Sequence, residues 1–177
     1  MSTFGTAFVV DVPTGASVGA EETLAEASDE ISSVPLDGGL VRLSRYSSDL
    51  EAIAEEITLL LAGLEGARAA LAEDFDEYGA RFRVLVGGVG HVYQAFVLNA
   101  DPEDPEAVEA AADDHEEDPR ADDLTGSDAA RRAAEVFDVD PTAMVEADRT
   151  YRSTAWEQIG VVGGPFPWWD ALGLECP

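Results

Sequence analysis

The sequence predicts an α+β fold: a mostly antiparallel sheet of about four strands, covered by one long amphipathic helix, with an acidic loop and a Trp-rich C-terminal segment. Three observations support this prediction. Short runs of alternating or apolar residues bounded by glycine and proline are typical of strands. Two such runs flank the glycine-rich residues 87–90, which is the pattern of a β-hairpin. The strongest helical periodicity in the chain spans residues 48–75.

Four segments have the residue pattern of strands. Residues 4–12 form an apolar run that ends at Pro13, and residues 40–46 alternate polar and apolar side chains like a half-buried strand. Residues 80–86 and 91–98 are the two arms of the predicted hairpin. Because both faces of residues 91–98 are apolar, we expect this strand at the centre of the sheet, covered on both sides.

The long predicted helix begins with a capping box formed by Ser48 and Glu51. Its apolar residues recur at the i, i+3, i+4 and i+7 spacing of a helix that packs on a core. Gly63 and Gly66 are points where this helix bends or ends. Shorter helices are predicted over residues 21–33, 107–112, 128–137 and 142–149. The resulting order of elements suits a two-layer sandwich.

Length and composition fit a single globular domain with three parts. The chain has 177 residues, about the size of one domain, of which 46% are hydrophobic and 27% charged. We divide it into an α+β core over residues 1–100, an acidic mobile segment over residues 101–126, and C-terminal helices with an aromatic docking segment over residues 127–177.

The charge balance excludes some classes of partner. The net charge is −27, with 37 acidic residues against 10 basic residues, all of which are arginine. With no basic patch expected, ordinary electrostatic binding to DNA, RNA or an anionic membrane is excluded. Residues 101–150 hold 18 acidic and four basic residues, and the rest of the chain is also acidic. Two explanations fit this pattern. The surface is adapted to high salt, or the protein comes from a GC-rich mesophile and its acidic segment binds a partner.

No group of residues has a catalytic or metal-binding pattern. The glycine-rich residues 87–90 lack the Lys-Ser/Thr ending of a phosphate loop. The two histidines, His91 and His115, accompany no nucleophile elbow, and we expect Cys176 to be an unreactive terminal thiol. A single cysteine also excludes a disulfide framework within the chain. The sequence therefore predicts no enzyme, no cofactor and no metal ion.

The candidate partner-binding residues are aromatic or acidic. If Trp168 and Trp169 occupy a helical turn, their rings diverge by about 100°, so one can pack on the core and the other on a neighbour. We prefer the interpretation in which all three tryptophans cover the chain's own sheet, and we keep an interface role as the alternative. The candidate residues are Trp156, Phe166, Trp168, Trp169, Asp113, Asp114, Glu116, Glu117 and Asp118.

Four arginines, Arg42, Arg45, Arg81 and Arg83, lie on the predicted strands. We expect them to pair with acidic helices nearby rather than to bind a ligand. No run of residues approaches the roughly 20 apolar residues of a membrane helix, and no signal-peptide pattern opens the chain. We therefore expect a protein of the cytoplasm or of a virus particle, with no membrane partner.

Three functions fit these observations. The first is a non-catalytic structural or interaction subunit of a larger assembly, in a salt-adapted organism or its virus, that binds other proteins or copies of itself. The second is an acidic inhibitor, such as an antitoxin, an immunity protein or a nucleic-acid mimic, that occupies the basic cleft of its partner. The third is a small enzyme or ligand-binding domain with a pocket at the sheet edge. No motif resembles a known family closely enough to name one.

Overall fold

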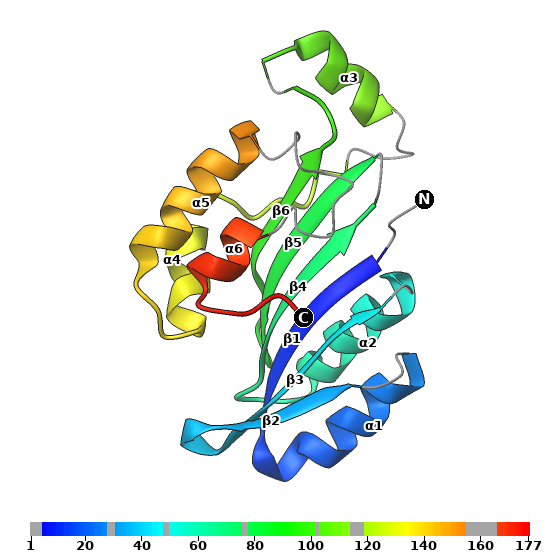
Figure 1. The fold of residues 1–177 in the computed structure, drawn as a ribbon, viewed down its shortest axis with the longest axis vertical. Helices are drawn as coiled ribbons and strands as arrows, with labels where there is room; N and C mark the ends of the chain where they lie inside the picture. The colour runs from blue at the N-terminus through cyan, green and yellow to red at the C-terminus, as the bar shows by residue number, and fades with distance from the viewer. Residues whose placement is uncertain are drawn as a thin grey trace.

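The computed structural model describes residues 5–27, 31–47, 50–75, 78–101, 103–113, 119–154 and 166–177. Within these residues six strands form one sheet in the order β2-β3-β1-β4-β5-β6, and every neighbouring pair is antiparallel. The α+β class is confirmed, whereas the expected number of four strands is wrong. The strands are β1 (Gly5–Pro13), β2 (Ser32–Leu36), β3 (Leu40–Ser47), β4 (Arg68–Asp74), β5 (Gly79–Val86) and β6 (Gly90–Leu98) (Figure 1).

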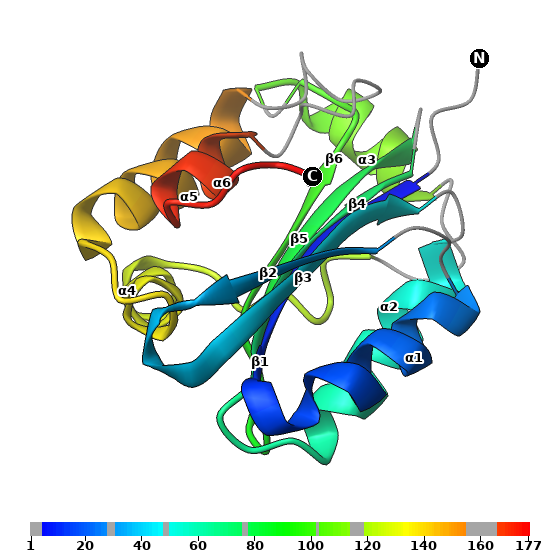
Figure 2. The same cartoon turned by 60° about the horizontal axis from the view of Figure 1, so that its bottom comes forward.

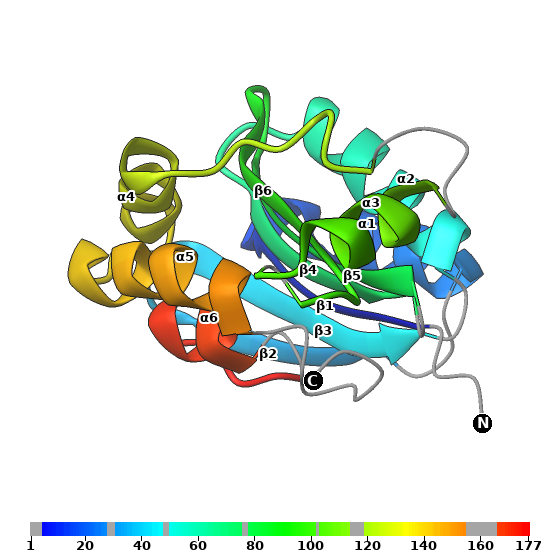
Figure 3. The same ribbon diagram turned by 90° about the horizontal axis from the view of Figure 1, so that it is seen from above.

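Helices cover both faces of this sheet, so the molecule has three layers rather than the expected two. The first two helices lie on one face, and α4, α5 and α6 lie on the other, as Figures 2 and 3 show. The helix α3 lies near the end of β6 and buries none of its residues. The helices are α1 (Ser17–Ala27), α2 (Leu50–Ala62), α3 (Pro105–Asp113), α4 (Ser127–Val136), α5 (Pro141–Thr154) and α6 (Phe166–Ala171), with short 3-10 turns at Thr14–Ala16 and Asp37–Gly39.

The first six of these strands and α-helices have the order β-α-β-β-α-β. The strand β3 lies between β1 and β2, and β4 lies on the other side of β1. This is the split βαβ, or ferredoxin-like, arrangement. The predicted hairpin, β5 and β6, is confirmed and extends the sheet beyond β4. Since this topology occurs in proteins of many functions, it identifies none by itself.

The strand β1 shows how the sheet separates two cores. Phe8 and Val10 pack with α1 and α2, whereas Ala7 and Val9 pack in the cluster that contains residues of α4, α5 and α6. Alternate side chains of a strand point to opposite faces. A strand buried on both faces therefore has a continuous run of apolar residues, and residues 7–10 show this pattern.

The long predicted helix is wrong in its second half. The helix α2 ends at Ala62, Gly66 has a positive φ of 79°, and residues 68–74 form the central strand β4. Ala69 and Leu71 pack under α2, while Ala70 and Ala72 pack on the opposite core. Burial between two layers of helices overrides the helical propensity of an alanine-rich segment.

The two edges of the sheet also differ from expectation. Residues 32–36, expected in part to be helical, form the edge strand β2, which is exposed from Ser32 to Pro35. Proline is compatible with an edge strand because one side of the strand needs no backbone partner. The strand β6 is the other edge rather than the centre of the sheet, and Leu124 pairs with Gln94 at its outer side.

Candidate functional site

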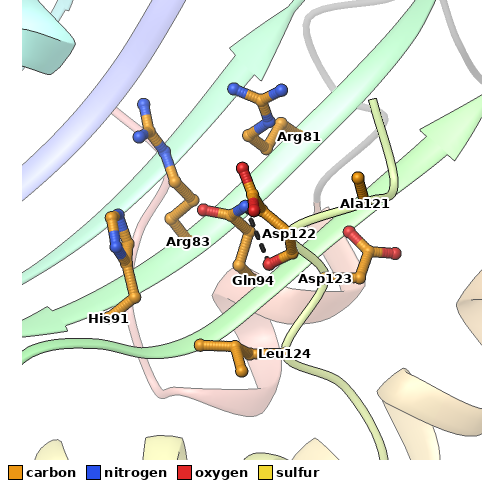
Figure 4. Close-up of a pocket in the computed structure, with 8 residues that line it drawn as sticks. All are labelled: Arg81, Arg83, His91, Gln94, Ala121, Asp122, Asp123 and Leu124. Atoms are coloured by element: carbon orange, nitrogen blue, oxygen red, sulfur yellow. Dashed lines mark hydrogen bonds between the residues drawn. The ribbon is translucent and has the colours of Figure 1, made fainter. Parts of the chain in front are cut away.

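A cavity of about 530 Å³ opens at the β5–β6 end of the sheet. Its floor is the face of β5 that carries Arg81, Arg83 and Leu85, and Leu85 packs in the core beneath α2. Alternation places the two arginines on this face, beyond the part of the sheet that α1 and α2 cover. We call this cavity the arginine pocket; its lining residues are Arg81, Arg83, His91, Gln94, Ala121, Asp122, Asp123 and Leu124 (Figure 4).

One wall of the arginine pocket is the segment of residues 121–124, which is hydrogen-bonded to β6. The backbone N–H of Gln94 donates to the carbonyl of Leu124 at 3.1 Å, and the N–H of Leu124 donates back at 2.8 Å. The Gln94 side-chain amide donates to the carbonyl of Asp122 at 3.1 Å (Figure 4). The Asp123 carboxylate accepts the N–H of Phe96 at 2.9 Å. This wall is therefore held by hydrogen bonds from three successive positions of the segment.

Arg81 is held by aromatic rings. Its guanidinium carbon lies 5.4 Å from the ring centre of Phe75 and 5.4 Å from that of Phe96. Such cation–π contacts fix a guanidinium without neutralising its charge. Within the described part of the chain, Arg81 has no carboxylate partner, and its buried Nε has no hydrogen-bond acceptor.

Arg83 is shared between the pocket and a buried carboxyl group. Its Nη2 lies 2.6 Å from Oε2 of Glu73 on the neighbouring strand β4, and the two side chains are 11% and 5% exposed. The buried Nε of Arg83 has no acceptor among the described residues. Burial raises the pKa of Glu73 above its usual value, and this effect exceeds the opposing influence of Arg83 and Arg81.

His91 also lines the pocket, and its charge state depends on its neighbours. Partial burial, and after it the positive charges of Arg83 and Arg81, lower the pKa of His91, while Asp122 acts in the opposite direction. The imidazole is therefore neutral at neutral pH. Its Nε2 atom is buried and has no partner in the described part of the chain.

These contacts correct the expectation for the strand arginines. Arg83 pairs with Glu73 of a neighbouring strand, and Arg42 pairs with Asp11 of another strand, rather than with acidic helices. The composition also predicts no basic patch. The fold nevertheless gathers two arginines and a histidine around one cavity, in a chain of net charge −27.

The adjacent tryptophans lie elsewhere, and both pack inward, as the preferred interpretation expects for them, rather than one of them facing a neighbour. Trp168 and Trp169 are 0% and 1% exposed, and both contact the ring of Phe82 on β5. Trp168 stacks on that ring at 5.0 Å, and Trp169 meets it edge-on at 5.3 Å. Since α6 contacts α5 and belongs to the same core as this face of the sheet, both ring directions meet apolar surroundings. Neither ring has exposed area for a partner to contact in this conformation.

The other candidate partner-binding residues do not form a common site in the described structure. Asp113 is exposed at the end of α3, and Phe166 begins α6. The remaining candidates, Trp156, Asp114, Glu116, Glu117 and Asp118, lie outside the described residues, as does Ser48 of the predicted capping box.

Sequence reasoning missed the arginine pocket, although part of its signal is local. Arg81 and Arg83 alternate with apolar residues on one arm of the hairpin, and Gln94 pairs with Arg83 on the other arm. A hairpin register therefore places these side chains on one face. Glu73 and the segment 121–124 join the site only through long-range pairing.

The comparisons with protein families, curated proteins and solved structures find no match to this chain. Among the described residues, no three His, Cys, Asp or Glu side chains are placed to hold a metal ion, and no helix has the length and apolarity needed to cross a membrane. Burial raises the pKa of the Cys176 thiol. Function must therefore be inferred from the chemistry of the arginine pocket.

Proposed function

We propose that the protein is a non-catalytic ligand-binding protein, whose ligand carries a small oxyanion that occupies the arginine pocket. The observation that carries this proposal is that the side chains of Arg81 and Arg83 line one cavity, and that the Nε atom of each has no acceptor among the described residues. A buried donor without an acceptor costs about 1–3 kcal/mol. An anion bound in the cavity would offer acceptor oxygens to the two guanidinium groups and balance their charge.

Size and charge support the same ligand class. Ligand pockets have volumes of about 300–1,000 Å³, and the arginine pocket has about 530 Å³. Of the two guanidinium groups, that of Arg83 is paired with the Glu73 carboxylate, whereas no ion pair of Arg81 is present among the described residues. The remaining carboxylates of the pocket are Asp122, which is exposed, and Asp123, which accepts a backbone N–H.

The lining residues support binding rather than covalent catalysis. The described lining includes no Ser, Thr, Cys, Lys or Tyr side chain, and of its residue types that can act as nucleophiles it holds His91, Asp122 and Asp123, the last of which accepts a backbone N–H. The pocket instead offers donors of fixed geometry, and an arginine fork is well suited to recognise carboxylate or phosphate-type oxygens.

Calorimetric titration with sodium acetate, sodium sulfate and sodium phosphate, in 0.5 M KCl, tests this function. We expect at least one anion to bind, and Arg81→Gln to weaken its binding by about ten- to a hundredfold, the usual loss of a charged hydrogen bond. Arg131→Gln is the matched control, because Arg131 is exposed on α4 and pairs only locally with Asp128. Absence of binding by all three anions, or equal losses in both variants, would contradict the proposal.

A second candidate function is a structural or interaction subunit of a larger assembly in a salt-adapted organism or its virus. The exposed edge strand β2 favours it, because residues 31–36 carry no charge in a strongly acidic chain and have an outer side that no described strand pairs with. Light scattering from 0.1 to 3 M KCl tests this candidate. A mass above that of one chain, lost in Val34→Asp, is the expected result; a single-chain mass at every salt concentration contradicts self-assembly.

A further inference from the structure

We propose that the arginine pocket takes up its oxyanion together with a proton, which is bound by Glu73, and that it thereby favours a doubly charged oxyanion over a singly charged one. This inference rests on the proposed anion-binding function. It extends that function by naming the charge class of the ligand and the group that responds to it.

Arg83 provides the physical connection between ligand and proton. Its Nη2 contacts Glu73 at 2.6 Å, and Arg83 is also one of the residues that line the cavity. An oxyanion that accepts a hydrogen bond from Arg83 therefore lies across one planar group from the Glu73 carboxylate. Two negative charges on opposite sides of one guanidinium repel each other strongly where water is largely excluded.

Glu73 is placed so that protonation is the easiest response to this repulsion. It is 4% exposed in the interior of β4, so no solvent screens its charge. Its opposite neighbour on β1 is Thr6, whose buried hydroxyl has no described partner, and α2 turns the apolar residues Ile53 and Ile57 to this face. Burial disfavours the ionised form of Glu73, whereas the positive charges of Arg83 and Arg81 on β5 favour it.

The other titratable groups of the pocket are less suited to take up the proton. His91 on β6 is only partly buried and does not contact Glu73 in the described structure. Asp122 is exposed, and Asp123 is held by the N–H of Phe96. On β4 itself, the neighbouring Asp74 points to the opposite face of the sheet. Glu73 is therefore the carboxyl group that shares an arginine with the ligand.

The charge of the pocket then determines the ligand that fits best. A dianion such as sulfate or a phosphate group repels the Glu73 carboxylate more strongly than a monoanion does. Protonation of Glu73 removes this repulsion, so a dianion gains more from it than a monoanion. Binding of a dianion should therefore draw more protons onto the protein than binding of a monoanion.

The test is calorimetric titration of the whole chain with sodium sulfate and sodium acetate, neither of which titrates near neutral pH. Measurements in buffers of different ionisation enthalpy, at 0.5 M KCl, give the number of protons taken up per anion. We expect sulfate binding to take up a substantial fraction of a proton and acetate binding to take up less. Sulfate affinity should fall as the pH rises, by at most about tenfold per pH unit.

Glu73→Gln separates this inference from a general effect of pH. The neutral amide mimics the protonated acid, so sulfate should bind this variant tightly at high pH, with no proton uptake. Glu135→Gln, on the exposed surface of α4, is the matched control and should behave as the unchanged protein. His91→Gln should keep the same number of protons taken up per sulfate bound, whatever its affinity for sulfate, because His91 does not bind this proton.

The outcomes distinguish the two proposals. No sulfate or acetate binding by the unchanged protein contradicts anion binding itself. Sulfate binding without proton uptake, or uptake that survives in Glu73→Gln and disappears in His91→Gln, overturns the role of Glu73 alone. If Glu73→Gln does not fold, as judged by its circular dichroism, the proton count of the unchanged protein and of His91→Gln still decides the question.

Discussion

At the scale of single residues, one buried carboxylate connects four elements. Asp11 on β1 is fully buried and accepts two hydrogen bonds from Arg42 on β3, at 2.7 and 2.8 Å. It accepts a third, at 2.8 Å, from Arg68 on β4. Arg68 also donates to the carbonyl of Val136 at 2.6 Å and so reaches the end of α4. A buried charge is tolerated when all its contacts are charged hydrogen bonds of this kind.

Asp11→Asn should therefore destabilise the protein by about 3 kcal/mol, because it leaves two partly buried arginines without their counter-charge. Urea unfolding measures this difference. Asp128→Asn is the control, since Asp128 and Arg131 form an exposed pair on α4, and such pairs contribute about 0–1 kcal/mol. Equal effects of the two substitutions would show that Asp11 does not organise the sheet.

The contribution of Glu73 to stability should depend on pH in a predictable direction. Burial raises its pKa in the folded protein, so the folded state holds the proton more tightly than the unfolded chain does. Its favourable contribution is complete below the unfolded pKa and is lost as the pH rises through the folded pKa. The difference in unfolding free energy between the unchanged protein and Glu73→Gln should therefore fall with rising pH. A difference that rises with pH would mean that the pairing with Arg83 outweighs burial.

At the scale of elements, local signals predict the hairpin and β1, but not β4 or β2. Residues 87–90 and the apolar runs beside them specify the hairpin without help from the rest of the chain. In contrast, Arg68, the alanines and Leu71 of β4 all favour a helix by intrinsic propensity. Only the layers above and below make this segment a strand. Because Glu73 is part of β4, an error in this element also hides the carboxyl group of the pocket.

The confirmed part of the amphipathic helix gives a prediction for α2. Ile57 is fully buried between α2 and the sheet, whereas Leu59 is 60% exposed. Ile57→Ala should cost about 2–5 kcal/mol of unfolding free energy, because it leaves a cavity. Leu59→Ala should change stability by about 0.5 kcal/mol or less. A small cost at Ile57, measured by thermal and urea unfolding, would contradict the packing of α2 on this core.

At the scale of the whole molecule, most of the negative charge lies outside the core. The helix α3 carries exposed acidic residues and buries none of its side chains, and the other helices also expose acidic residues, beside arginines and neutral residues. The buried charges form local groups around Asp11 and around Arg83, together with Asp74 and with Asp148, which accepts the hydroxyl of Tyr93. Long-range repulsion therefore acts across the surface, where dissolved salt can screen it.

Stability should consequently rise with salt, and the form of the rise tests the origin of the acidity. The net charge is −27, and the screening length falls from about 30 Å at 0.01 M to about 3 Å at 1 M salt. Screening alone should raise the unfolding midpoint mainly below about 0.5 M KCl. We expect a salt-adapted protein to gain further stability up to 3 M KCl. A plateau by 0.5 M would contradict salt adaptation and favour a basic partner, and a flat response would contradict self-repulsion altogether.

Arg81→Gln should show the same salt dependence of the unfolding midpoint, because the effect belongs to the whole surface. A smaller rise in this variant would mean that chloride bound in the arginine pocket supplies part of the stability.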